Sequence, residues 1–161
     1  MVPIVLWLIM VGWDSFTERM IALVLLISAA STDGIDGAIA RKRNLVTNLG
    51  KILDPIADKA LLSGALIVLS IQDAVPWWAT IAILVREFGI TVYRLAVARR
   101  KVIAASGGGK FKTVIQIIGV SMALAPFEAL GSWWVWLTQA VILFAVVITW
   151  YTGIQYLRPQ K

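Results

Sequence analysis

The sequence of 161 residues contains no cysteine and no histidine. These two absences exclude disulfide bonds, thiol nucleophiles, thiolate zinc sites and imidazole bases. Any bound metal must therefore be a hard cation held by oxygen ligands. Any general base must be a carboxylate, a lysine or a tyrosine.

Charged residues are also scarce, at 15% of the chain against 60% hydrophobic residues, whereas soluble domains average about 25% charged. Crossing a bilayer takes about 20 mostly apolar residues in a helix. We expect an all-α, polytopic membrane protein of about six helices, at residues 2–13, 20–42, 49–72, 76–99, 112–130 and 133–157. The first helix is short or truncated. No repeat or second domain is indicated, so residues 1–161 are predicted to form one transmembrane domain.

The net charge of +6 is unevenly distributed. Basic residues gather in the loops around 41–51 and 99–112 and in the tail, whereas the alternate loops hold only Arg19 among mainly acidic residues. The positive-inside rule therefore predicts that both termini are cytoplasmic. Basic residues in short loops fit anionic lipid headgroups or phosphorylated substrates, and no nucleic-acid partner is expected.

Four aspartates lie close together between apolar runs: Asp33, Asp36, Asp54 and Asp58. Helical residues three or four apart share a face, so an antiparallel helix pair would bring all four carboxylates together near the cytoplasmic surface. Such carboxylates repel one another unless cations neutralise them. The pattern predicts a site for two divalent ions, Mg²⁺ or Mn²⁺.

Two other interpretations of the aspartates are open. In the first, they cap helix ends or pair with neighbouring basic residues, although ionisable residues inside membranes are usually functional. In the second, they form the permeation site of a divalent-cation transporter, which would need polar groups near the bilayer midplane and beyond. The outer halves of the segments are almost purely apolar, so transport is the weaker hypothesis.

The stretch Asp33-x-x-Asp36-Gly37-x-x-Ala40-Arg41, then eight residues, then Gly50-x-x-x-Asp54-x-x-x-Asp58 resembles the signature of the CDP-alcohol phosphatidyltransferase family at every fixed position. The resemblance covers nearly the whole chain. No signature position is lost, which disfavours a catalytically dead lipid-binding homologue. It implies a homodimer in the bacterial cytoplasmic membrane, with the active site facing the cytoplasm. An acceptor hydroxyl would displace CMP from a CDP-linked lipid at a dinuclear metal site.

The same resemblance implies roles for single residues. Asp33, Asp36 and Asp54 would be metal ligands, and Asp58 would complete the site and deprotonate the acceptor. The nucleotide-binding residues would be Gly37, Ala40, Arg41 and Gly50. One departure is at the start: family members carry an amphipathic stretch before the first helix, whereas this sequence opens with MVPIVLWLIM. Either that stretch is lost or the start of the chain is misassigned.

The acceptor must be inferred from later residues. Arg86 and Arg94 are eight residues apart, a little over two turns, and share a helix face, while Lys110 and Lys112 open the next helix. These four cations are predicted to bind a phosphate on the acceptor. We expect Glu87 to point elsewhere. The alternatives are an ion pair of Arg86 with a buried carboxylate, and lysines that anchor to anionic lipid.

Four phrases, LDPIADK, REFGIT, VIAAS and GKFKT, resemble the bacterial phosphatidylglycerophosphate synthase branch of the family. This branch uses CDP-diacylglycerol as donor and glycerol 3-phosphate as acceptor. The rival within the family is a phosphatidylinositol phosphate synthase, whose acceptor, inositol phosphate, also carries a phosphate.

Overall fold

The computed structural model describes the backbone of residues 2–42, 50–97 and 108–157, and the side chains of residues 2–32, 59–93, 111–128 and 130–155. The described backbone is helical and contains no strand. Its elements are α1 (Val2–Val11), α2 (Phe16–Lys42), α3 (Gly50–Ile71), α4 (Trp77–Val97), α5 (Gly108–Leu124), the short 3₁₀ helix η1 (Glu128–Leu130) and α6 (Ser132–Leu157). The prediction of an all-α fold with about six helices is confirmed.

The expected boundaries differ most at α5. We predicted a helix over residues 112–130, but α5 begins at Gly108 and ends at Leu124. Pro126 explains the early end, because proline has no N–H to donate and disfavours helical geometry at the residue before it. The chain then makes a separate turn, η1, before α6 begins.

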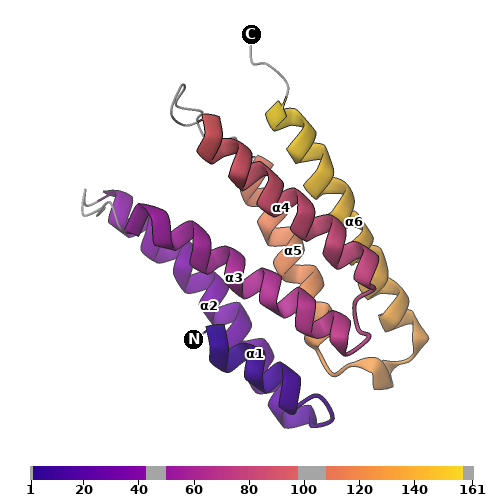
Figure 1. Cartoon of the computed structure of the whole chain (residues 1–161). Coiled ribbons are helices and arrows are strands. Elements are labelled where there is room, and N and C mark those ends of the chain that lie inside the picture. The colour runs from indigo at the N-terminus through magenta and orange to yellow at the C-terminus, as the bar shows by residue number, and fades with distance from the viewer. Residues whose placement is uncertain (1, 43–49, 98–107, 158–161) are drawn as a thin grey trace.

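The helices alternate in direction along the bundle (Figure 1). The α1–α2, α3–α4 and α5–α6 connections lie at one end, here called the lower end. The last turns of α2, α4 and α6 and the first turns of α3 and α5 lie at the opposite, upper end. This arrangement is the antiparallel pairing of α2 with α3 that the aspartate hypothesis requires.

The N-terminal and C-terminal helices form two connected groups. The helix α1 packs on α2 and α3, while α6 packs on α5 and α4, and α3 contacts both α4 and α5. Fully buried apolar side chains, including Ile9, Leu26, Leu66 and Leu124, fill the shared core. Figure 1 shows that α2 and α3 lean away from α4 and α6 toward the upper end.

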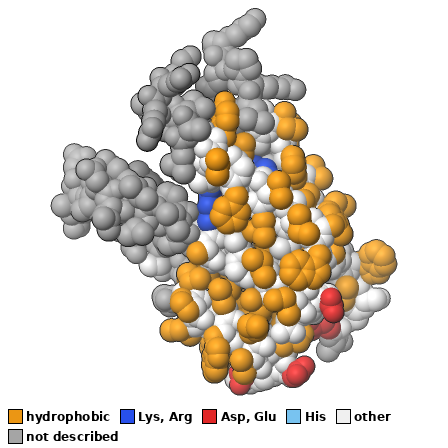
Figure 2. All heavy atoms as spheres, in the orientation of Figure 1, with side chains coloured by type: hydrophobic (Ala, Val, Ile, Leu, Met, Phe, Trp, Pro, Cys, Tyr) orange, Lys and Arg blue, Asp and Glu red, His pale blue; other side chains and the backbone are white. Residues whose placement is uncertain are grey.

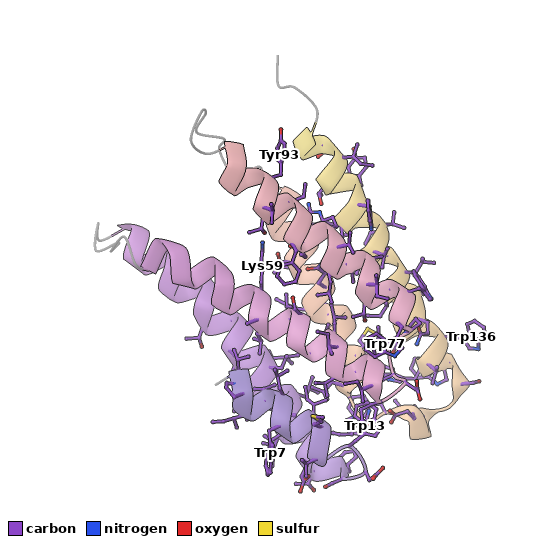
Figure 3. The ribbon with its side chains drawn as sticks, viewed as in Figure 1. Trp7, Trp13, Lys59, Trp77, Tyr93 and Trp136 are labelled. Atoms are coloured by element: carbon purple, nitrogen blue, oxygen red, sulfur yellow. The ribbon has the colours of Figure 1, made fainter. Side chains whose placement is uncertain are left out.

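Much of the outer surface is apolar. Figure 2 shows hydrophobic side chains over the visible face, with the visible acidic side chains gathered at the lower end. Trp7 and Trp136 project outward from α1 and α6 (Figure 3), and Trp136 is 76% exposed. Large apolar patches of this extent are rare on soluble monomers and mark surfaces covered by lipid or another protein.

By length and composition, Ser132–Gln155 in α6 could cross a membrane, and it is the one such helix found among the described residues. Shorter apolar helical stretches cover Val2–Val11, Lys59–Ile71 and Phe111–Leu124. Six membrane spans and the orientation of the termini therefore stay predictions.

Arg19 connects two helices at the lower end. Its guanidinium donates to the carbonyl oxygens of Leu124 at 3.0 Å and Ala125 at 3.1 Å, and to Oε1 of Glu128 at 2.6 Å. The same group lies 4.1 Å from the centroid of the Trp13 ring. Since Leu124 is the last residue of α5, Arg19 satisfies carbonyl groups that a helix end leaves without partners.

Candidate functional site

The aspartates of the predicted metal site lie on two consecutive antiparallel helices. Asp33 and Asp36 are in the last turns of α2, and Asp54 and Asp58 are in the first turns of α3. Both sets of turns lie at the upper end (Figure 1). The backbone thus places the two pairs at the same end of adjacent helices, as the sequence predicted.

The side chains of these aspartates lie outside the described residues, and so do those of Gly37, Ala40, Arg41 and Gly50. Among the side chains that are described, no group of three or more acidic residues could hold a metal ion. The metal-ligand and nucleotide-binding assignments therefore stay predictions based on the motif and on the positions of α2 and α3.

A second set of charged side chains meets where α4, α5 and α6 pack together. Nη1 of Arg86 donates to Oε1 of Glu87 at 3.1 Å, and Nη2 donates to Oγ1 of Thr152 at 3.0 Å. The same Oε1 of Glu87 accepts a hydrogen bond from Nζ of Lys112. Arg86 and Lys112 are 7% and 6% exposed. One carboxylate oxygen thus holds two buried cations from two helices.

A third cation approaches from α3. Nζ of Lys59 donates to the backbone carbonyl of Glu87 at 3.4 Å, and Figure 3 shows Lys59 extending from α3 toward α4. Lys59 follows Asp58 directly in the sequence. This contact therefore connects the helix that carries the predicted base with the helix that carries Arg86.

The expectation that Glu87 points elsewhere is wrong. The Arg86–Glu87 ion pair forms even though neighbouring helical residues do not face each other directly. Both side chains are long, and Lys112 from α5 neutralises the carboxylate that Glu87 brings into the interface. The ion pair considered as an alternative for Arg86 is therefore present, and Lys112 shares it.

The predicted acceptor site is only partly described. Arg86 and Lys112 are brought together through Glu87, as given above, whereas the side chains of Arg94 and Lys110 lie outside the described residues. Among the described side chains that contact one another here, the two cations Arg86 and Lys112 outnumber the single carboxylate of Glu87. A local excess of positive charge favours an anionic ligand.

The guanidinium of Arg86 also lies against α6. Its Nε is buried and has no hydrogen-bond partner among the described residues. A Cβ atom placed on Gly153 would lie 2.9 Å from this Nε, a distance too short to be accommodated without a shift. Glycine at position 153 therefore allows Arg86 to pack closely on the α6 backbone.

With this geometry established, comparison with known proteins identifies the family. The model for "CDP-alcohol phosphatidyltransferase" matches residues 1–151. The chain belongs to the CDP-alcohol phosphatidyltransferase family.

Similar members of the family come from several bacteria. A Bacillus subtilis protein named CDP-diacylglycerol–glycerol-3-phosphate 3-phosphatidyltransferase is 47% identical over 152 residues, covering 87% of this chain and 76% of that protein. A Mycobacterium tuberculosis protein named probable phosphatidylglycerophosphate synthase is 41% identical over 157 residues, covering 97% of this chain and 74% of that protein. A Rickettsia felis protein with the same name as the Bacillus protein is 36% identical over 145 residues, covering 89% of this chain and 80% of that protein.

For this CDP-alcohol phosphatidyltransferase, the sequence analysis missed three residues near Arg86. They are Glu87, Thr152 and Gly153. One signal was available for Thr152 and Gly153: with Thr149 they are small or polar residues three and four apart within a mostly apolar helix. In a membrane, such a stripe indicates close helix packing or a polar contact between helices.

Proposed function

We propose that this protein transfers the phosphatidyl group of CDP-diacylglycerol to glycerol 3-phosphate, giving phosphatidylglycerol phosphate and CMP. The observation that carries this proposal is the family match over residues 1–151, together with relatives at 41% and 47% identity whose names state this reaction or its product. These names favour glycerol 3-phosphate over inositol phosphate as the acceptor.

Two divalent ions, Mg²⁺ or Mn²⁺, are assigned to the carboxylates of Asp33, Asp36, Asp54 and Asp58. The donor set fits, because carboxylate oxygens are the ligands that these hard cations prefer, and the chain has no cysteine or histidine to select another metal. The placement of α2 and α3 as consecutive helices that meet at the upper end supports the same assignment. When bound, the ions neutralise negative charge on the diphosphate and on the departing CMP.

Asp58 is assigned as the general base. It accepts the proton of the primary hydroxyl of glycerol 3-phosphate as that oxygen attacks the phosphorus atom that carries the diacylglycerol. One O–P bond to the acceptor forms, and the O–P bond to CMP breaks. The leaving CMP carries away the electron pair of that bond.

Substrate binding is divided between two regions. Gly37, Ala40, Arg41 and Gly50 are assigned to the nucleotide, because small residues let a ligand approach the helix backbone and arginine binds phosphate oxygens. Arg86, Arg94, Lys110 and Lys112 are assigned to the phosphate of the acceptor. Lys59 on α3 donates to the backbone carbonyl of Glu87 on α4, and this contact supports the proximity of the two regions.

The protein is assigned to the bacterial cytoplasmic membrane as a homodimer, with six membrane spans, both termini in the cytoplasm and the active site on that side. Three features support this topology: the basic loops of the sequence, the acidic side chains at the lower end, and the apolar outer surface. Arg19, the basic residue of the lower end, is paired with Glu128 and does not oppose this orientation.

The experiment is a measurement of CMP release by the purified protein with CDP-diacylglycerol and Mg²⁺ or Mn²⁺. Release that depends on glycerol 3-phosphate is the expected result. Release with inositol phosphate alone would keep the reaction class and change the acceptor. If the purified protein releases no CMP with either acceptor, that result would contradict the proposed function.

A further inference from the structure

Three residues hold Arg86 from different sides. Glu87 accepts from Nη1, Thr152 accepts from Nη2, and Gly153 leaves the space into which Nε packs. We call Glu87, Thr152 and Gly153 the Arg86 cradle. The motif that identifies the family contains none of these three residues.

The chemistry of Thr152 fits a holding role. Its hydroxyl donates within α6 to the carbonyl oxygens of Ile148 at 2.8 Å and Thr149 at 3.0 Å. The donor is therefore already used, and the oxygen is oriented to accept a bond from Arg86. Because this contact involves no carboxylate, it fixes one end of the guanidinium without placing a negative charge beside it.

Glu87 has a different effect, because it contacts two cations. The side chain of Glu87 is 13% exposed, and its Oε1 contacts both Arg86 and Lys112. Two buried cations this close would repel each other strongly without an anion between them. Glu87 therefore allows Arg86 and Lys112 to lie side by side, and these three described side chains together keep a net positive charge.

We propose that the Arg86 cradle positions Arg86 and Lys112 for the phosphate of the acceptor, and that it thereby sets the affinity for a phosphorylated acceptor. The inference rests on the proposed function. Glu87, Thr152 and Gly153 act through the two cations and make no contact with substrate. A preformed pair of cations binds phosphate more tightly than two mobile side chains, because less side-chain freedom is lost on binding.

A positioning role for Glu87 and a role in charge balance alone predict opposite changes in the affinity for glycerol 3-phosphate. Glu87→Gln removes a negative charge next to the predicted phosphate site, so a purely electrostatic role predicts tighter binding of glycerol 3-phosphate. A positioning role predicts weaker binding, because Arg86 and Lys112 lose their common partner. We expect the KM for glycerol 3-phosphate to rise about tenfold, while the KM for CDP-diacylglycerol changes by less than about twofold.

Two variants test the cradle without a change of charge. Thr152→Val removes the acceptor for Nη2 in a side chain of nearly the same shape, and Gly153→Ala places a methyl group against Nε. Each is expected to raise the KM for glycerol 3-phosphate about three- to tenfold with little change in kcat. These variants keep the proposal testable if Glu87→Gln fails to fold.

The matched control for Gly153→Ala is Gly119→Ala. Gly119 lies on α5 against α6, and a Cβ atom there would lie 3.0 Å from Cδ1 of Ile142. Gly153→Ala crowds α6 against Arg86 of α4, and the control introduces similar crowding at the contact of α6 with α5, against an apolar side chain and two turns along α5 from Lys112. We expect its KM for glycerol 3-phosphate to equal that of the wild type.

The experiment is steady-state CMP release with each substrate varied in turn, for the wild type and the four variants Glu87→Gln, Thr152→Val, Gly153→Ala and Gly119→Ala. A selective rise in the acceptor KM in the three cradle variants supports the proposal. An unchanged or lowered acceptor KM, or an equal rise for both substrates, overturns it. Wild-type protein without acceptor-dependent release would contradict the proposed function itself, whereas active wild type with unchanged cradle variants contradicts the cradle alone.

Discussion

The two ends of the helix bundle each bury an arginine, but they use it differently. At the lower end, two nitrogens of Arg19 donate to the carbonyls of Leu124 and Ala125 and to Glu128, and the guanidinium lies against Trp13. Arg19 therefore bonds to the carboxyl-terminal end of α5 and to one carboxylate. Both of these nitrogens are bonded to groups of the protein itself.

At the upper end, Arg86 shares the carboxylate of Glu87 with Lys112 and leaves its Nε without a partner in the described part of the chain. Among the described side chains of this group, two cations contact one carboxylate. The comparison teaches that two arginines of similar burial can have different surroundings. Arg19 pairs with one half-exposed carboxylate, whereas Arg86 shares its carboxylate with a second buried cation.

The largest expected effect at the upper end comes from Asp58→Asn. The amide cannot accept the acceptor proton, so we expect kcat for CMP release to fall about 10³-fold. The matched control is Asp73→Asn at the lower end, where the residue has a positive φ of 57° that asparagine also adopts readily. Full turnover by Asp58→Asn would remove Asp58 from the base role.

The second largest expected effect is on substrate binding and comes from replacing Arg86, the arginine at the upper end. Arg86→Ala removes charged hydrogen bonds to the predicted phosphate, so the KM for glycerol 3-phosphate should rise about 10- to 100-fold, and more than the KM for CDP-diacylglycerol. Kinetics with each substrate varied separately measure this. A larger rise for the lipid would contradict the assignment of Arg86 to the acceptor.

The lower arginine should affect stability instead. Arg19→Ala leaves two carbonyl groups near the end of α5 without their donor, and we expect the free energy of unfolding to fall by about 2–4 kcal/mol. Unfolding in detergent measures the loss, and the KM values should match the wild type. A variant as stable as the wild type but with a raised acceptor KM would break the contrast between the two ends.

The smallest expected effect is that of Glu128→Gln. The side chain of Glu128 is 51% exposed, and ion pairs at exposed sites contribute about 0–1 kcal/mol. The same unfolding assay should therefore give a value within about 1 kcal/mol of the wild type. A loss as large as that of Arg19→Ala would mean that the ion pair, and not the α5 carbonyls, is what Arg19 provides.

The sequence predicted the parts of the fold that depend on local pattern. The apolar runs gave six helices, and the spacing of Asp33, Asp36, Asp54 and Asp58 placed two pairs at the facing ends of α2 and α3. The motif was specific enough to indicate the family before any comparison, because eight fixed positions at set spacings rarely agree by chance.

The contacts between distant residues could not be predicted in the same way. Glu87 was expected to point away from Arg86, because sequence spacing does not reveal that Lys112 on α5 would neutralise it. Arg19 was interpreted only as a loop charge, because its partners Leu124 and Ala125 are more than a hundred residues away. The early end of α5 was missed although Pro126 signalled it, because the apolar run continues past the proline.

The most direct test of the central claim is acceptor-dependent release of CMP from CDP-diacylglycerol by the purified protein with a divalent metal ion. The account predicts release with Mg²⁺ or Mn²⁺ that requires glycerol 3-phosphate and stops when a chelator removes the metal. Turnover that continues with chelator, or that inositol phosphate supports and glycerol 3-phosphate does not, would contradict it.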